Sequence, residues 1–256
     1  CLVVIPTFYP GEKIINCIGK DRKDTSMLVK VFCETFKNMK KQPALIMKTS
    51  SAGFSIIDRE NMLNKINSLK EHTNGKCPNI YLVHGDFTDG EMNELYNHPK
   101  VKAHVSFTHG EGFGRPLLEA SLSEKPVIAS NWSGHLDFLN KNAVLLDGNM
   151  EKVQKGSFPD DFFVEGMEWF TVNYKKASDT FRKIYRSYKK YTPNAKRLAN
   201  HNYKTFSLDM MTKELGILLD KYVPEFPKQV KLELPKLKKV DSKEPPKLEL
   251  PKLKKV

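Results

Sequence analysis

Residues 108–120 read THGEGFGRPLLEA, in which two glutamates, Glu111 and Glu119, flank a segment with two glycines and a proline. The apolar stretch KAHVSFT (102–108) precedes this segment, and helix-favouring residues follow it. We therefore predict a strand, a tight loop and a helix in succession. Glycines let the loop backbone approach a ligand closely, and proline is tolerated in the first turn of a helix.

A loop of this kind provides a place for a phosphate group. The first backbone N–H groups of a helix have no partner inside the helix, and they carry the positive end of its dipole. Glu119 falls about one turn inside the predicted helix, where it can accept hydrogen bonds from sugar hydroxyls, and Glu111 stands on the loop. The arrangement fits a nucleotide sugar. The alternative, a carboxylate pair that hydrolyses glycosides, explains neither the loop nor the position of Glu119 and ranks below.

Apolar and amphipathic segments alternate through the first 150 residues or so. Strands are expected at 13–18, 43–49, 79–85, 102–108, 125–130 and 142–147. Helices are expected at 25–39, 58–71, 89–98, 115–124 and 133–140. Such alternation indicates an α/β fold, with a Rossmann-like parallel sheet and helices on both faces, whose ligands bind at the carboxyl ends of the strands.

The rest of the chain divides into a helical segment and a tail. Residues 168–221 are expected to be mostly helical, with two apolar stripes that we interpret as packing faces (Phe181, Ile184, Tyr185 and Tyr188; Met210, Met211, Leu215, Leu218 and Leu219). The sequence KLELPKLKKV occurs at 231–240 and again at 247–256. Repeated prolines and lysines predict a disordered tail, either a solvated linker or a docking peptide for another protein.

Composition narrows the functional classes. The formal net charge is +12, but only six of the 42 basic residues are arginine, and this argues against nucleic acid as the partner because arginine dominates phosphate and base recognition. The four cysteines lack the spacing of a zinc site. No stretch resembles a signal peptide or a membrane span, so we expect a cytoplasmic protein, with peripheral membrane association left open.

The longer segment SFTHGEGFGRPLLEASLSEKPVIASNWSGHLDFL (106–139) resembles the signature of the GT-B fold glycosyltransferases of family 4, and the similarity extends over about residues 3–222. This resemblance implies the donor-binding C-terminal half of a GT-B fold. It divides the chain into an interdomain linker or strand (1–12), the nucleotide-sugar-binding domain with its C-terminal helices (13–222) and the tail (223–256).

The resemblance also implies roles for individual residues. Glu119 corresponds to the glutamate that holds the donor ribose, and Glu111 to the one beside the donor sugar and the reacting centre. The donor diphosphate would lie against residues 112–115, which are Gly112, Phe113, Gly114 and Arg115. In the loop GKDRKD (19–24), Lys23 matches the family's catalytic lysine.

Other residues match the family less closely. Lys20 stands where the family has arginine, and Arg22 is a substitute for it; the alternative for this loop is a solvated charged turn. His84 and Phe87 lie where the nucleotide base is expected. His109 is interpreted as a polar lining group and is left out of the catalytic set.

The implied reaction is transfer of a sugar from a nucleotide diphosphate with retention of configuration. The chain contains no D-x-D triplet, so we expect no metal and no other cofactor. The acceptor, whether glycan, lipid or protein, is not indicated, and an acceptor-binding N-terminal domain would come from the same protein or a partner chain. The alternative is a nucleotide-sugar-binding or scaffold protein without turnover.

Overall fold

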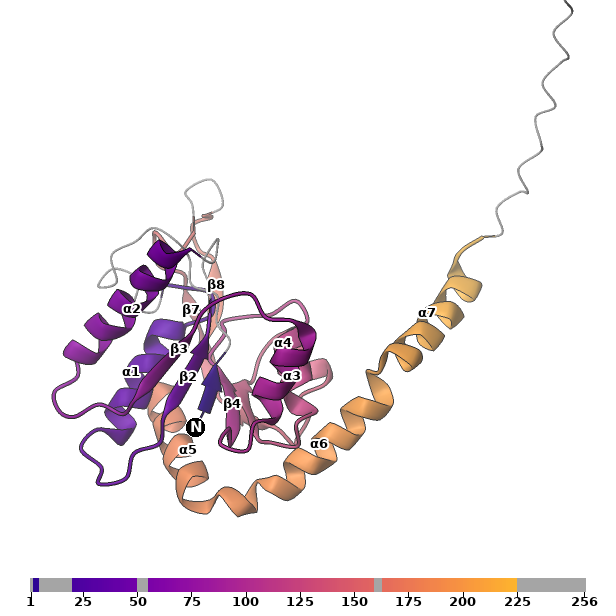
Figure 1. Cartoon of the computed structure of the whole chain (residues 1–256). Helices are drawn as coiled ribbons and strands as arrows, with labels where there is room; N and C mark the ends of the chain where they lie inside the picture. The colour runs from indigo at the N-terminus through magenta and orange to yellow at the C-terminus, as the bar shows by residue number, and fades with distance from the viewer. Residues whose placement is uncertain (1, 5–19, 50–54, 159–162, 225–256) are drawn as a thin grey trace, which may run out of the picture. The chain divides into compact units, whose positions relative to one another are not determined.

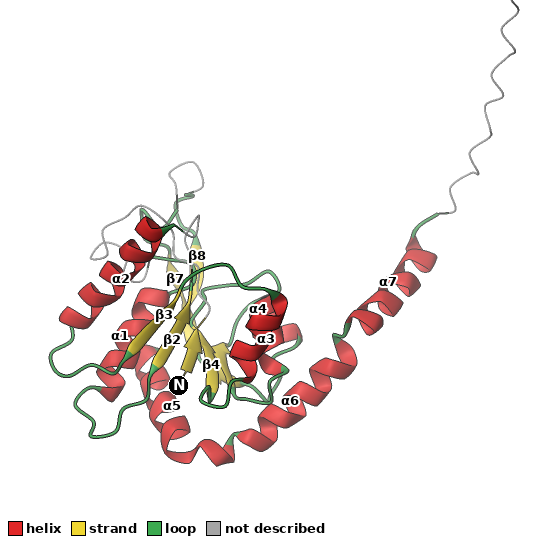
Figure 2. Cartoon of the chain, viewed as in Figure 1, coloured by secondary structure: helices red, strands yellow, loops and turns green. Residues whose placement is uncertain are grey.

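A six-stranded parallel sheet forms the centre of the unit that ends at Glu214 (Figures 1 and 2). The computed structural model describes residues 2–4, 20–49, 55–158 and 163–224. The strands of the sheet are β1 Leu2–Val4, β2 Leu45–Lys48, β3 Ile80–Val83, β4 Ala103–Ser106, β5 Val127–Ser130 and β6 Val144–Leu146. They lie in the order β3-β2-β1-β4-β5-β6, and every neighbouring pair is parallel.

Helices connect these strands and extend beyond them. They are α1 Thr25–Phe36, α2 Ile56–Glu71, α3 Asp89–Asn97, α4 Arg115–Ser121, α5 Tyr174–Ser187, α6 Thr192–Thr205 and α7 Leu208–Tyr222, with the short 3₁₀ helices η2 Gly134–Asp137 and η4 Tyr188–Lys190. Residues up to Glu214 form one unit, and residues from Leu215 onward form a second.

Local sequence explains where several helices begin. The Thr88 side chain accepts a hydrogen bond from the Glu91 N–H, and Glu91 reaches back to the Thr88 N–H, which makes a capping box at α3. Ser55 caps α2 in the simpler way, by accepting from the N–H of Asp58 (3.1 Å). α4 begins after Gly114, whose φ of 86° is a left-handed conformation that glycine adopts readily, and Pro116 follows in its first turn.

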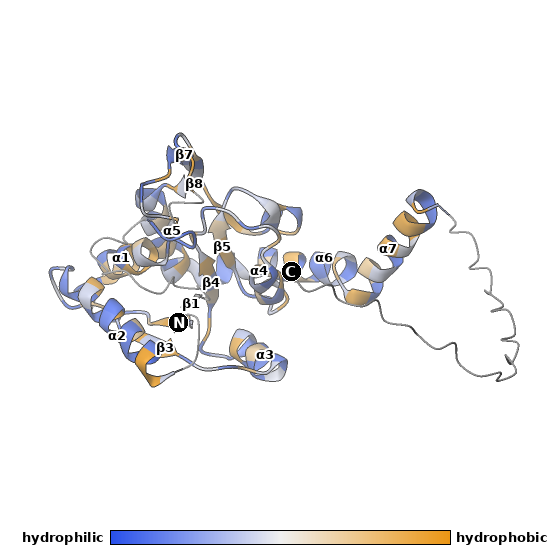
Figure 3. Cartoon of the chain, turned by 90° about the horizontal axis from the view of Figure 1, so that it is seen from above, coloured by the Kyte–Doolittle hydropathy of each residue, from blue (hydrophilic) through white to orange (hydrophobic). Residues whose placement is uncertain are grey.

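Two apolar cores lie on opposite faces of the sheet. The first joins the sheet to α1, α2 and α5, and the second joins it to α3, α4 and α6. On β5, Ile128 belongs to the first core, while Val127 and Ala129 belong to the second. Figure 3 shows apolar β4 and β5 between α1 and α5 on one side and α4 on the other. Burial on both faces explains why these strands read as continuous apolar runs.

The predicted fold class is confirmed. Each of the five expected strands from residue 43 to 147 is present within a few residues of its predicted position, and helices separate them as expected. The expected strand at 13–18 and the tail from residue 225 lie outside the described residues. Leu2–Val4, assigned by resemblance to an interdomain linker or strand, pair with both β2 and β4. The sheet therefore begins before residue 13, the predicted start of the domain.

Residues 168–221 are mostly helical, as expected, but a strand that was not predicted comes first: β8 (Glu168–Val172) pairs antiparallel with β7 (Gly148–Lys152). Aromatic and β-branched residues in EWFTV favour a strand. The predicted apolar stripe of α5 does pack, since Phe181 and Ile184 are buried, whereas α7 has no buried residue. Among the described residues, no helix combines the length and apolar character needed to cross a membrane.

Phe181 offers a test of the first core. Its ring stacks on Phe107 (centroids 5.8 Å apart) and meets Phe32 edge-on (6.3 Å), and it is 2% exposed. We expect Phe181→Ala to lower the free energy of unfolding by about 3–5 kcal/mol, because it leaves a cavity between α5 and the sheet. Urea unfolding measures this, with the exposed Tyr203→Ala on α6 as the control. A loss below about 1 kcal/mol would contradict the described packing.

Candidate functional site

The strand order places a crevice beside the quoted motif. The order 3-2-1-4-5-6 reverses direction between β1 and β4, and in open parallel sheets ligands bind outside the carboxyl ends of the strands at such a switch point. The loop after β4 carries Glu111 and leads into α4. The loop before α1 meets it there, since the N–H of His109 donates to the carbonyl of Arg22 (2.9 Å). Residues about 87 positions apart thus form one site.

An ion pair between Lys23 and Glu111 lies at the centre of this site. The Lys23 Nζ donates to Oε1 of Glu111. Arg22 binds the same loop, with its Nη1 2.7 Å from the carbonyl oxygen of Gly110 and 3.4 Å from Oε2 of Glu111. The side chain of Glu111 is 10% exposed and that of Lys23 is 16% exposed, against 43% for Arg22. Both oxygens of the Glu111 carboxylate therefore face a cation.

Burial and charge act in opposite directions on this pair. Burial raises the pKa of Glu111, but the hydrogen bond and charge of Lys23, together with Arg22, outweigh it and hold that pKa below its ordinary value. Burial lowers the pKa of Lys23, and the Glu111 carboxylate only partly restores it. The carboxylate thus owes its charged state to its two basic neighbours.

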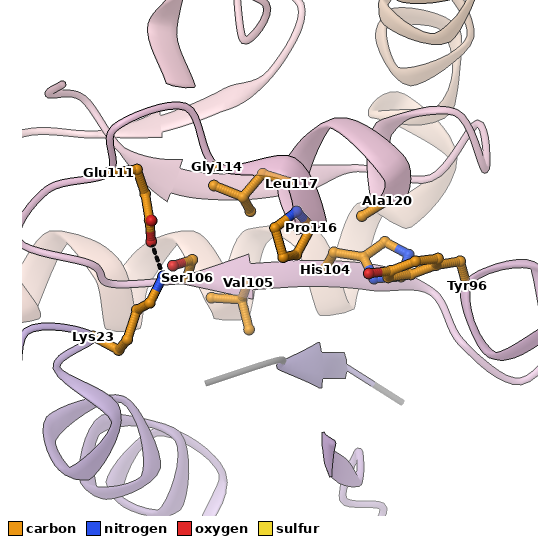
Figure 4. A pocket seen from close by; sticks show the side chains of 10 residues that line it. All are labelled: Lys23, Tyr96, His104, Val105, Ser106, Glu111, Gly114, Pro116, Leu117 and Ala120. Carbon is orange, nitrogen blue, oxygen red and sulfur yellow. Dashed lines mark hydrogen bonds and ion pairs between the residues drawn. The ribbon is translucent and has the colours of Figure 1, made fainter. Parts of the chain in front are cut away.

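A small cavity opens beside the ion pair, with a volume of about 30 Å³. Lys23 and Glu111 form one end of it, the start of α4 forms a wall, and Tyr96 and His104 lie at the other end. Figure 4 shows Lys23 and Glu111 pointing toward each other from their separate loops. The cavity therefore joins the two charged side chains to the first turn of α4.

Unpaired backbone donors line the loop that enters α4. No hydrogen bond among the described residues uses the N–H of Gly112, Phe113, Gly114 or Arg115. A side chain at position 114 would be strained by the φ of 86° and would approach Cβ of His135 to 3.1 Å. These N–H groups and the cations before α1 are suited to bind an anion together.

Glu119 is held on α4 by two neighbours. The hydroxyl of Tyr96 donates to its Oε2 (3.3 Å), and Nε of Arg115 lies 3.0 Å from its Oε1. Tyr96 is 3% exposed and lines the same cavity as Glu111. Glu119 is more open, with 38% of its side chain exposed. The two glutamates of the motif thus border one cavity region, one directly and the other through Tyr96.

The remaining predicted residues are placed less uniformly. Lys20 lies in the loop before α1 and forms no ion pair with another described residue, and Phe113 is 40% exposed beside Phe138 (5.2 Å). His84 and Phe87 lie after β3 and do not line the cavity. The Nδ1 of His84 is 3.2 Å from the Thr49 carbonyl, and the Lys48 Nζ lies over the Phe87 ring (4.8 Å). A role for His84 and Phe87 with the base stays a prediction.

His109 is a structural residue. It is 3% exposed, its ring stacks on Trp169 (3.9 Å), and its Nδ1 lies 2.7 Å from the carbonyl oxygen of Phe170. Burial lowers the pKa of His109 to about 4, with partial compensation by that carbonyl. Its omission from the catalytic set agrees with this placement, although it is buried against β8 and not exposed along a pocket.

Two residues that contact the motif were not singled out from the sequence. Tyr96 lies on α3, more than 20 residues before Glu119, and no local pattern links them. Ser133 binds the backbone of Glu111 through its side chain. The only signal for Ser133 was its position before Gly134 in the turn that follows β5.

Comparison with known proteins identifies the family. The model of the family described as "Glycosyl transferases group 1" matches residues 8–156, which is more than half of the chain. The chain belongs to this family. A search of curated proteins found no match.

Solved structures of group 1 glycosyltransferases and their relatives share the fold. The C-terminal domain of the group 1 family protein LpcC from Francisella tularensis is 15% identical, with a TM-score of 0.51 over 81% of this chain and 86% of that one. A glycosyltransferase from Rickettsia africae is 17% identical (TM-score 0.54), over 86% of this chain and 47% of that one. Anabaena HepE, solved with UDP and glucose, is 12% identical (TM-score 0.54), over 86% and 48%. The chain thus spans about half the length of the two longer structures and has the fold of a GT-B C-terminal domain.

The pKa of His109 predicts how acid affects this glycosyltransferase domain. Since the folded pKa lies below that of a free histidine, the unfolded chain binds a proton first as the pH falls below about 6.5, and stability is lost between there and about 4. Acidification from pH 7 to about pH 5 should lower the free energy of unfolding by about 2 kcal/mol through His109. In His109→Gln, the loss on acidification should therefore shrink by about that amount, whatever the substitution costs at pH 7.

Urea unfolding at both pH values measures the difference, with the exposed His201→Gln as the control. The comparison must be made between variants, because Asp24 acts in the opposite direction: burial raises its pKa to about 8, so its contribution weakens folding as the pH rises. An unchanged pH dependence in His109→Gln would contradict the buried neutral imidazole.

Proposed function

We propose that this chain is the donor-binding domain of a retaining glycosyltransferase, which transfers a sugar from a nucleotide diphosphate to an acceptor whose chemistry the site does not indicate. The observation that carries the proposal is the Lys23–Glu111 ion pair at the switch point of the sheet, beside N–H groups that have no partner among the described residues. A buried carboxylate between two cations, next to unused backbone donors, suits a ligand that joins a phosphate to a sugar.

The diphosphate of the donor would lie against the loop before α4. The N–H groups of residues 112–115 would donate to its oxygens, and Lys23 and Arg22 would turn from Glu111 toward them, with Lys20 nearby. Negative charge grows on the diphosphate as the sugar leaves, and fixed cations and dipoles stabilise it in the transition state. This chemistry is available from side chains and backbone alone, and we propose a reaction that uses no metal.

The two glutamates would divide the rest of the donor between them. Glu119, open on α4, would accept hydrogen bonds from the ribose hydroxyls, while Glu111 would act at the donor sugar, with Lys23 as the second catalytic residue. The base would extend toward His84 and Phe87 after β3. Carboxylate oxygens bind paired hydroxyls well because they accept several hydrogen bonds.

The bound ligands of structural relatives support a nucleotide sugar. The Anabaena protein HepE was solved with UDP-glucose as well as with UDP and glucose, and the TarM protein of S. aureus was solved with UDP. Each has the fold of this chain in one of its parts, at 12–14% identity. For this chain, uridine nucleotides are therefore the first ligands to test.

Transfer itself requires an acceptor site, which we assign to a second domain in the same protein or in a partner chain. Binding without turnover is the alternative, and it predicts the same nucleotide affinity. An assay for release of the nucleotide diphosphate from the donor, with water as acceptor, separates the two, since hydrolysis requires the catalytic pair Lys23 and Glu111.

Calorimetric titration with UDP, GDP and ADP tests the donor site. We expect the chain to bind at least one of them, and Glu119→Ala to weaken that binding about tenfold or more, because the ribose loses a charged acceptor. Glu94→Ala, an exposed glutamate on the neighbouring α3, is the matched control and should bind as the wild type does. If the wild type binds none of the three nucleotides, the proposed function is wrong.

Glu111 should affect the diphosphate in the opposite direction. In the described structure its carboxylate forms ion pairs with both Lys23 and Arg22, so a diphosphate must compete with it for these cations. We expect Glu111→Gln to raise the affinity for the nucleoside diphosphate several-fold and to reduce sugar release from the donor. Glu94→Gln again serves as the control, and weaker diphosphate binding in Glu111→Gln would show that the cations do not face the phosphates.

A further inference from the structure

Ser133 has a backbone conformation that serine rarely adopts. It follows β5 and directly precedes η2, with φ 84° and ψ −174°. This region is essentially restricted to glycine, and a residue held there costs about 1–3 kcal/mol. Asp24, by comparison, has φ 48° and ψ 39°, the ordinary left-handed region that aspartate tolerates. Strain of this kind persists only where the surroundings impose it.

The surroundings of Ser133 are the backbone of Glu111. The Ser133 hydroxyl donates to the Glu111 carbonyl (2.7 Å) and accepts from the Glu111 N–H (3.0 Å). The N–H of Gly134 donates to the same carbonyl (3.0 Å). Both polar groups of the Glu111 backbone are therefore held by the turn that follows β5.

The two loops also fit together too closely for another side chain. A Cβ atom on Gly134 would lie 1.9 Å from the carbonyl oxygen of Gly112 and 2.9 Å from that of Glu111. The strained φ and ψ of Ser133 bring its hydroxyl into this contact. A glycine at position 133 would adopt the same backbone without strain, so the hydroxyl is what serine adds.

We propose that Ser133 is a positioning residue, which fixes Glu111 against the sugar of the bound donor. This inference rests on the proposed function. Lys23 and Arg22 hold the Glu111 side chain in the described structure, but a bound diphosphate would draw both away. The contacts of Ser133 are to the backbone and do not involve the phosphates. They keep the carboxylate in place when its cations turn to the ligand.

Three substitutions separate this role from a structural one. Ser133→Gly removes the hydroxyl and relieves the strain, Ser133→Ala removes the hydroxyl alone, and Ser133→Thr keeps the hydroxyl while adding a branched side chain. We expect Ser133→Gly to melt at or above the wild-type temperature, and Ser133→Ala and Ser133→Thr to melt several degrees lower.

The affinity for the donor should follow a different order. The probes are UDP and UDP-glucose, with GDP and GDP-mannose as the second pair, titrated into the full chain. Ser133→Gly and Ser133→Ala should each lose about tenfold in affinity for the nucleotide sugar and less than about twofold for the nucleotide alone. Ser133→Thr should bind the sugar nucleotide within about threefold of the wild type despite its lower melting temperature.

Several results would overturn the inference while leaving the proposed function intact. These are wild-type affinity for the nucleotide sugar in Ser133→Gly, affinity that follows the melting temperature across the three variants, or equal losses for nucleotide and nucleotide sugar. A wild-type chain that binds neither pair of probes overturns the proposed function and this inference with it.

Discussion

The ion pair between Lys23 and Glu111 connects the two loops on which the site depends. One loop precedes α1 and the other follows β4. Their contact places the charges of Lys23 and Glu111 side by side in the crevice at the switch point. The pair is largely shielded from water, so its attraction is screened less than that of a surface pair, but each charge has also lost hydration. An arrangement of this kind contributes little net stability. It is explained better by a ligand that replaces one of the partners.

Backbone constraints make this contact possible. Gly114 turns the chain into α4 with a left-handed φ, and Gly134 lets the turn after β5 lie against the carbonyl of Gly112. In the same turn, Ser133 has a strained backbone conformation. The loop after β4 therefore packs tightly against the turn after β5, and within the described part of the chain the N–H groups of residues 112–115 have no partner and remain available for a ligand. The parallel sheet supplies the rigid support on which such a fit can be kept.

The sequence was informative where the chemistry is local. The alternation of strands and helices predicted the sheet from β2 to β6, and the glycines and glutamates of residues 108–120 predicted the loop and the helix after it. The β7–β8 pair was not predicted because β7 consists mostly of polar residues and because a long connection separates it from β8. Tyr96 and Ser133 were missed because they reach the motif through tertiary contacts, and a single sequence gives no measure of such distances. Ser133 in particular has a backbone conformation that a serine in the sequence would not predict.

The two glutamates differ in how easily a ligand could displace their partners. Arg115 and Glu119 are one helical turn apart and exposed, at 78% and 38%, and pairs of this kind contribute only about 0.3–0.5 kcal/mol. A ribose hydroxyl would replace Arg115 at little cost, while Tyr96 keeps the carboxylate in position from the buried side. Glu111 is the reverse case, since its carboxylate is largely enclosed between two cations and its backbone is held by Ser133. In the proposed function, the open glutamate would therefore bind and release the nucleotide, and the enclosed one would act at a fixed point on the donor sugar.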